Sequence, residues 1–321
     1  MSDLLNVATG DDQVTEHADW VELQCLFKSD GSVSREDLSR AIQRVGHVGD
    51  HRVDDRARNL ADLAFDELAD REATLAGPAS RFLRYPYELV SKDQVLRYKP
   101  RRAERLSDGL VYLFLLTVTR HSMEAKKRIH DQVDPTEVFE RLCSEVLLHF
   151  WGGRDGRAEA TIVGTSARAS GRQKFPDAVN ALCGALREGG GWRKSARSPK
   201  AGDGGVDLAV CRKFSDGRQG GLVGFAQCKT GVNWRSYLGT LRPRAFCQNY
   251  MNSPLLLDPQ AVYMTPGRVN RDRWTHDTNN AGAILFDRCR LVEYGELITQ
   301  RTRSSCAKWL GKALHHQGVG T

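Results

Sequence analysis

Two short stretches between residues 202 and 231 decide the fold predicted for this chain: GDGGVD at residues 202–207 and GFAQCK at residues 224–229. Asp207 opens one short apolar run, and the second stretch places an amide and a lysine at alternate positions. Because alternate residues of a strand share a face, we expect Gln227 and Lys229 to point the same way and Cys228 to point into the core. If the two strands pair, Asp207, Gln227 and Lys229 meet at one edge of a sheet.

These three side chains fit the needs of phosphodiester hydrolysis, which must neutralise the scissile phosphate, activate a water and stabilise the departing oxygen. Mg²⁺ does much of this when it is held by one or two hard oxygen ligands and left mostly hydrated. Asp207 is the predicted main ligand, and Gln227 offers its amide oxygen in place of a carboxylate. Lys229 is predicted to hold the attacking water or to stabilise phosphate charge. The structural alternatives are a turn-side carboxylate, an edge-strand amide and a surface lysine.

Asp207 followed by Gln227-x-Lys229, with the glycine-rich lead-in at 202–206, resembles the Mrr-type restriction endonucleases of the PD-(D/E)XK superfamily. The resemblance covers the chain from about residue 135 onward, with a helix-like stretch at 241–251 and strand-like stretches at 261–265, 282–287 and 291–294. It implies an α/β restriction-endonuclease-like core, a central mixed sheet flanked by helices. It also implies a DNA endonuclease that uses Mg²⁺ or Mn²⁺ and serves bacterial defence against phage, as a restriction enzyme or as an effector.

The same resemblance implies a fourth site residue, Glu140. Families of this type often carry a glutamate after a phenylalanine on the first helix of the core, and Phe139-Glu140 fits that pattern. The helix itself is predicted from Asp134-Pro135, in which the aspartate caps and the proline suits the first helical position. A further helix, predicted at 176–188, lies between Glu140 and Asp207, so an exposed helix-face glutamate is the open alternative.

Positive charge is concentrated around the predicted site. Residues 191–245 hold eleven Lys and Arg against three Asp, in a chain whose formal net charge is +7. Lysines and arginines bind polyanions by releasing condensed counterions, so DNA is the expected partner; a solvated basic face is the alternative. Trp234 and Arg235 follow the lysine and could stack on or clamp the substrate, although a tryptophan beside a helix start is more often part of the core.

Bulk features favour a cytoplasmic protein without a membrane partner. The longest apolar run, at 110–118, is far shorter than the roughly 20 residues of a membrane span. The first residues, MSDL, lack the basic and apolar regions of a signal peptide. The eight cysteines never occur as Cys-x-x-Cys, which argues against a zinc or redox pairing and favours a reducing compartment.

The chain is predicted to contain two domains: a mostly helical sensor or docking domain at 1–130 and the nuclease-like domain at 131–321. In the first, residues 34–45 and 54–76 are predicted helices, and 82–99 is strand-prone around a turn at 91–93. Helices followed by a hairpin would also fit a winged helix that reads DNA, an alternative that stays open. In the second domain, the polar residues 154–174 are predicted to form a mobile loop over the site.

A catalytically inactive nucleic-acid-binding or scaffolding subunit is the alternative to the nuclease, because Gln227 stands where a glutamate is usual. Two sites are needed to cut two strands, so a homo-oligomer is expected. A separate defence protein is the other expected partner. Since no phosphate-binding Gly-x-x-x-x-Gly-Lys-Ser/Thr occurs in the sequence, an ATPase motor would have to be such a partner.

Overall fold

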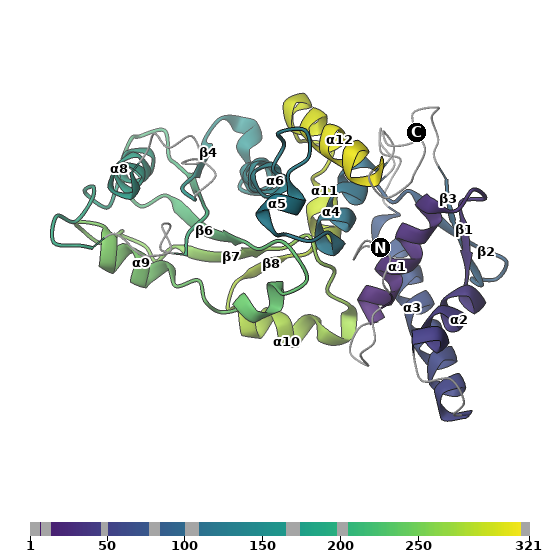
Figure 1. Ribbon diagram of the computed structural model, residues 1–321. Coiled ribbons are helices and arrows are strands. Elements are labelled where there is room, and N and C mark those ends of the chain that lie inside the picture. Colours follow the sequence, from purple (N-terminus) through teal and green to yellow (C-terminus); the bar gives the residue numbers. More distant parts are fainter. Residues whose placement is uncertain are drawn as a thin grey trace. The chain divides into compact units, whose positions relative to one another are not determined.

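The computed structural model describes residues 7, 14–45, 51–76, 84–99, 109–164, 174–197 and 205–315 (Figure 1). The chain forms two compact units: unit 1 comprises Met1–Val133, Gly267–Asn270 and Arg303–Thr321, and unit 2 comprises Asp134–Pro266 and Arg271–Thr302. The predicted boundary at 130/131 lies close to the break after Val133, but 267–270 and 303–321, expected in the second domain, group with unit 1. Among the described residues, no helix combines the length and apolar character needed to cross a bilayer.

Unit 1 is built from helices and a small antiparallel sheet with the strand order β1-β3-β2. Its elements are α1 (Val14–Phe27), β1 (Ser32–Ser34), α2 (Arg35–Val45), α3 (His51–Leu75), β2 (Tyr87–Val90), β3 (Val95–Tyr98), α4 (Leu110–Arg120) and α5 (Ala125–Arg128). The predicted hairpin is β2–β3. Its turn at Ser91, Lys92 and Asp93 has φ between 56° and 62° at all three residues, the left-handed conformation that tight turns require. The strand β1 was not predicted.

A buried ionic cluster lies in the core of unit 1. The guanidinium of Arg71, which is fully buried, donates to Asp19 and Glu22 at 2.8 Å and to Glu67 at 2.9 Å. The hydroxyls of Tyr85 and Tyr112 both donate to Oε1 of Glu22 at 2.7 Å. Burial alone would lower the pKa of Arg71, but the nearby acidic groups, led by Glu22, raise it well above its ordinary value. Three buried carboxylates therefore share the single positive charge of Arg71.

Unit 2 is built around a mixed five-stranded sheet with the strand order β4-β5-β6-β7-β8 (Figure 1). Its strands are β4 (Ala158–Ile162), β5 (Leu208–Arg212), β6 (Leu222–Cys228), β7 (Gln260–Met264) and β8 (Ile284–Phe286). The pairs β4–β5 and β5–β6 are antiparallel, whereas β6–β7 and β7–β8 are parallel. A tight turn can join antiparallel strands, but parallel strands need a crossover. The helices α9 (Pro243–Tyr250) and α10 (Arg271–Ala281) lie in these two crossovers.

Helices cover both faces of this sheet. On one face, α8 (Phe175–Leu186) and α9 pack with alternate residues of β5 and β6, among them Ala209, Cys211, Val223 and Phe225. The other face carries α6 (Pro135–Phe150), which contacts β4, β5 and β6. As predicted, α6 begins at Asp134, whose carboxylate accepts from the Thr136 backbone N–H at 2.9 Å. The fold is thus an α/β sandwich in which α6 is the first helix.

Two predictions for unit 2 are wrong. The stretch 154–174 is not simply a loop, because it contains the short helix η2 (Gly153–Asp155) and the edge strand β4; residues 165–173 lie outside the described part. The stretch 291–294 is not a strand but belongs to α11 (Arg288–Glu293) and its C-terminal cap. The carboxylate of Asp287 accepts from the Arg290 backbone N–H at 3.1 Å and so starts a helix there. The last helix of the described chain is α12 (Gln300–His315).

Candidate functional site

Asp207 and Gln227 both lie at one end of the five-stranded sheet. The register of β5 and β6 ends with the pair Leu208 and Ala226, and Asp207 and Gln227 are the residues that adjoin this pair in the chain. The Asp207 backbone N–H donates to the Ala226 carbonyl at 2.9 Å. The structure therefore places both predicted site residues at the same end of the sheet, with the Asp207 backbone held by the residue that precedes Gln227.

The carboxylate of Asp207 is buried, with 5% of the residue exposed. Its Oδ2 atom accepts a hydrogen bond from the Cys228 backbone N–H at 2.8 Å. The backbone N–H groups of Val163 and Gly164, just after β4, donate to the Asp207 carbonyl at 2.8 and 2.9 Å. A Cβ atom at Gly164 would stand 3.2 Å from Oδ1, so a glycine lets the chain pass close to the carboxylate. Backbone contacts from two strands thus fix the orientation of Asp207.

Gln227 is also buried, and its amide contacts the residues that follow η3 (Trp234–Tyr237). The Thr240 hydroxyl lies 2.9 Å from the Gln227 Oε1 atom and 2.7 Å from the Tyr237 carbonyl oxygen. Its single proton can reach only one of these acceptors at a time. With the amide turned by half a rotation, Nε2 donates to Thr240, Thr240 donates to Tyr237, and Oε1 faces the opposite side. The amide can therefore present its oxygen to a cation without losing the Thr240 contact.

Lys229 follows two residues later, just beyond the end of β6. Its backbone N–H donates to the Met264 carbonyl at 3.0 Å, which holds it at the carboxyl end of β7. Its ammonium nitrogen stands 5.2 Å from the centre of the Tyr237 ring. Gln227 and Lys229 therefore both reach the segment that begins with η3, as the expected shared face requires.

Glu140 lies on α6, the helix that approaches the end of β6 at two cysteine thiols. The thiols of Cys143 on α6 and Cys228 at the end of β6 influence each other's pKa, so the Cys228 side chain faces this helix. Burial chiefly raises the pKa of the Cys228 thiol, and the Cys143 contact and the charges of Asp207 and Glu140 raise it further. Both carboxylates therefore act electrostatically on the same thiol. The intervening helix α8 packs on the opposite face of the sheet.

The donor set at this end of the sheet is small. Within the described residues, no three His, Cys, Asp or Glu side chains are grouped so that they could hold a metal ion. The predicted ligands are one carboxylate and one amide oxygen, both hard donors of the kind that Mg²⁺ takes together with several waters. One carboxylate and one amide oxygen would suffice only for a weakly held, largely hydrated Mg²⁺. They do not form a cage made wholly of protein ligands.

Trp234 and Arg235 have structural roles. Trp234 is buried, its carbonyl accepts from the Tyr263 hydroxyl at 2.6 Å, and its ring lies 4.4 Å from the guanidinium carbon of Arg235. Arg235 also pairs with Asp277 of α10 at 2.9 Å. The core alternative is thus the correct one for Trp234. The exposed aromatic of this segment is Tyr237, with 47% of its surface accessible, and sequence reasoning missed it because nothing in the local pattern marks it.

The basic residues of 191–245 do not all surround this site. Arg212 and Lys213 lie at the far end of β5, where they pair with Asp155 and Glu159. Arg218 is exposed in the turn between β5 and β6, whereas Arg242 lies next to the segment that contacts Gln227. The expectation of a single basic cluster around the site is therefore wrong in part, because the strands carry these charges to both ends of the sheet. Asp203, which belongs to the glycine-rich lead-in, lies outside the described residues.

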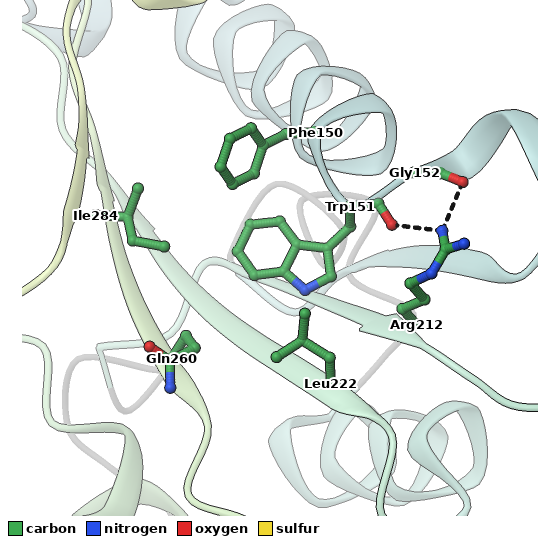
Figure 2. A pocket seen from close by; sticks show the side chains of 7 residues that line it. All are labelled: Phe150, Trp151, Gly152, Arg212, Leu222, Gln260 and Ile284. Carbon is green, nitrogen blue, oxygen red and sulfur yellow. Dashed lines mark hydrogen bonds between the residues drawn. The ribbon is translucent and has the colours of Figure 1, made fainter.

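A cavity of about 370 Å³ opens at that far end of the sheet (Figure 2). Its lining is Phe150, Trp151, Gly152, Arg212, Leu222, Gln260 and Ile284. The Arg212 guanidinium donates to the carbonyl oxygens of Trp151 and Gly152 at 2.9 and 2.8 Å, so it stabilises the backbone there. The remaining lining is apolar except for one amide. The cavity thus has no group suited to acid–base or metal chemistry and is separate from Asp207.

The geometry does not by itself assign a family. No family model matches the sequence, and the searches of curated proteins and of solved structures likewise found no match.

Proposed function

We propose that unit 2 is a metal-dependent nuclease that hydrolyses phosphodiester bonds in DNA. The observation that carries the proposal is that Asp207, Gln227 and Lys229 lie at one end of the sheet, Asp207 just before β5 and Gln227 and Lys229 at the end of β6. Carboxylate and amide oxygens beside an ammonium group combine cation binding with phosphate binding. The proposed nuclease is a restriction-endonuclease-like enzyme of the Mrr type.

The order of elements supports this resemblance. The helix α6 precedes the antiparallel strands β4, β5 and β6, and α9 leads to β7, which is parallel to β6. After Lys229, α9 is followed by β7 and β8, which are two of the three strands expected there. The placement of Glu140 on the first helix, close enough to act on the same thiol as Asp207, supports the fourth predicted residue.

Asp207 and Gln227 would hold Mg²⁺, or Mn²⁺ in its place, and the bound cation would lower the pKa of a water and neutralise phosphate charge. Asp207 is oriented for this by the Cys228 backbone N–H, and its negative charge draws the cation to the strand ends. Lys229 donates to a phosphate oxygen or to the attacking water, and so stabilises charge that develops during the reaction. Glu140 would accept a hydrogen bond from a water bound to the cation.

The test of this proposal uses purified protein, plasmid and linear DNA, and Mg²⁺ or Mn²⁺ against a chelator control. Wild type is expected to cut only with the cation. The Lys229→Ala variant should lose on the order of 100-fold in cleavage rate while largely keeping DNA affinity. Lys213→Ala is the matched control, because Lys213 directly follows the far end of β5, as Lys229 follows β6, and pairs with Glu159. Cleavage by Lys229→Ala at the wild-type rate would remove Lys229 from the mechanism.

A non-catalytic nucleic-acid-binding subunit is the second candidate function. It is favoured by the amide at Gln227 and by the small donor set among the described residues. Such a protein would bind DNA without cutting it under any metal condition. In either case the proposed setting is bacterial defence, with unit 1 as the sensor or docking part and a homo-oligomer or a partner protein supplying the second site. Size measurement by light scattering tests the oligomer.

A further inference from the structure

The segment Thr230–Thr240, here called the 230–240 loop, connects Lys229 to α9 and exposes two apolar side chains beside it. Val232 is 52% exposed and Tyr237 is 47% exposed. Single exposed apolar residues are common on protein surfaces. These two, however, share one short loop, and the Tyr237 ring lies next to the ammonium group of Lys229 at 5.2 Å.

Buried and charged contacts attach the 230–240 loop to the rest of unit 2, so its backbone is held in one position. Trp234 packs into the core and accepts from the Tyr263 hydroxyl at 2.6 Å. Arg235 binds Asp277 of α10 at 2.9 Å, and the Leu238 backbone N–H donates to the Arg235 carbonyl at 3.2 Å. The Thr240 backbone N–H closes the next turn on the Tyr237 carbonyl at 3.2 Å. The loop therefore holds the Tyr237 backbone in place, while the ring itself stays open to solvent.

The Lys229 ammonium lies over the half-exposed Tyr237 ring, so one side of the ring faces the cation. A cation and an aromatic ring in contact recognise a group that carries both a phosphate and a π surface, which is a nucleotide. Lys229 binds the phosphate, and the tyrosine ring offers a stacking platform for the adjoining base. Bases inside a duplex already stack on both sides, so only an unpaired or extruded base can use such a platform.

We infer that Tyr237 stacks on a base next to the phosphate bound by Lys229, so that the site selects single-stranded or locally unpaired DNA. This inference rests on the proposed function and adds the substrate class to it. Tyr237 thus acts as a residue that determines specificity, and Lys229 acts on the reacting phosphate. Val232 extends the apolar face of the same loop.

The experiment measures binding of the full-length protein to labelled oligonucleotides by fluorescence anisotropy, with a chelator present to prevent hydrolysis. The probes are an oligothymidine, a strand of equal length whose sugars lack bases, and a blunt duplex. The variants are Tyr237→Ala, which removes the ring, and Tyr237→Phe, which keeps it. Phe214→Ala is the matched control, because Phe214 is an exposed aromatic in the turn between β5 and β6, at the other end of the sheet.

Tyr237→Ala is expected to weaken oligothymidine binding roughly 5- to 100-fold, the range that one base–aromatic stack supports. The same variant should bind the baseless strand and the duplex as wild type does, and Tyr237→Phe and Phe214→Ala should bind all three as wild type does. Equal loss on the baseless strand would overturn the inference, because it would show a role that needs no base. So would unchanged oligothymidine affinity combined with slower cleavage, since Tyr237 would then only position Lys229.

A separate cleavage assay with Mg²⁺ distinguishes failure of the inference from failure of the proposed function. Base-dependent binding through Tyr237 without any cleavage would retain the nucleotide site and reject the nuclease. Cleavage of duplex and single strand at equal rates by both wild type and Tyr237→Ala would retain the nuclease and reject the substrate preference.

Discussion

The Oδ2 atom of Asp207 accepts a hydrogen bond from the Cys228 backbone N–H at 2.8 Å, so the carboxylate is tied to the strand that carries Gln227 and Lys229. This bond gives Asp207 a structural task besides any catalytic one. Substitutions can distinguish these two roles, because the first needs only a hydrogen-bond acceptor and the second needs a negative charge.

Asp207→Asn keeps an acceptor oxygen for Cys228 but removes the charge. If Asp207 holds the cation, cleavage should fall by on the order of 100-fold or more, with little change in the free energy of unfolding. Asp207→Ala should also cost about 1–3 kcal/mol of stability, since the buried Cys228 N–H loses its partner. Cleavage rates and urea unfolding curves check both. Full activity in Asp207→Asn would show that the carboxylate serves the fold alone.

From the raised pKa of the Cys228 thiol we expect the folded protein to lose stability at alkaline pH. This pKa is raised well above the ordinary value of 9.0, mainly by burial. The unfolded chain therefore releases this proton above pH 9 while the folded protein keeps it, so stability is full below pH 9 and falls as the pH rises toward the folded pKa. Urea unfolding at a series of pH values should show this fall. In Cys228→Ala the decline should be shallower, by up to about 1.4 kcal/mol per pH unit. Identical slopes for the two proteins would contradict the assignment.

Part of this fold follows from the sequence because local patterns determine it. Asp134-Pro135 marks the start of α6, and the apolar runs after Asp207 and before Lys229 form the paired strands β5 and β6. The strand β4 was missed because Ala158–Ile162 is an edge strand with small and polar residues, so it has no strong alternation. The sequence predicts a strand where α11 lies, because periodicity does not distinguish a short apolar strand from a short buried helix.

Local sequence patterns do not reveal contacts between residues that are far apart in the chain. Arg268 follows β7 in the chain but belongs to unit 1, where it pairs with Glu67 at 3.1 Å and with Asp70 at 2.7 Å. Some 200 residues separate these partners. The exposure of Tyr237 is likewise set by how the 230–240 loop folds on Trp234, which no spacing in the sequence reveals. A sequence motif was enough to predict the site residues. The conformation of the 230–240 loop, which contacts Gln227 and Lys229, could be seen only in the structure.

Arg71→Met should strongly destabilise unit 1. The change leaves Asp19, Glu22 and Glu67 without the guanidinium that they share, and breaking a buried ion pair by removing one partner costs about 3–5 kcal/mol. Arg40→Ala provides the comparison, because Arg40 pairs with Glu36 on an exposed helix face and such pairs contribute about 0–1 kcal/mol. Urea unfolding followed by circular dichroism measures both. Equal small effects would mean that the buried carboxylates find other partners.

Two glycines of unit 2 should respond to alanine with opposite signs. In β6, a Cβ atom at Gly224 would stand 2.7 Å from the Trp151 ring, so Gly224→Ala should cost about 1–3 kcal/mol through overpacking. Gly184 is exposed on α8 with no atom within 4 Å of an added Cβ, so Gly184→Ala should stabilise by about 0.5–1 kcal/mol. Thermal unfolding measures the two shifts. A stable Gly224→Ala protein would require the Trp151 ring to move.

Gln227→Glu distinguishes the nuclease from the non-catalytic alternative. The change places a second carboxylate beside Asp207, so the site should attract a divalent cation more strongly, lowering the Mg²⁺ concentration for half-maximal cleavage by on the order of tenfold. Without metal the two neighbouring carboxylates repel each other, which should lower the unfolding temperature, and added Mg²⁺ should then raise it more than in wild type. Gln260→Glu on β7, which lines the cavity at the far end of the sheet, is the control and should change neither quantity. A Gln227→Glu protein that neither cuts DNA nor gains stability from Mg²⁺ would place the chain among binding subunits, because the charge required to hold a cation would then be present without any effect.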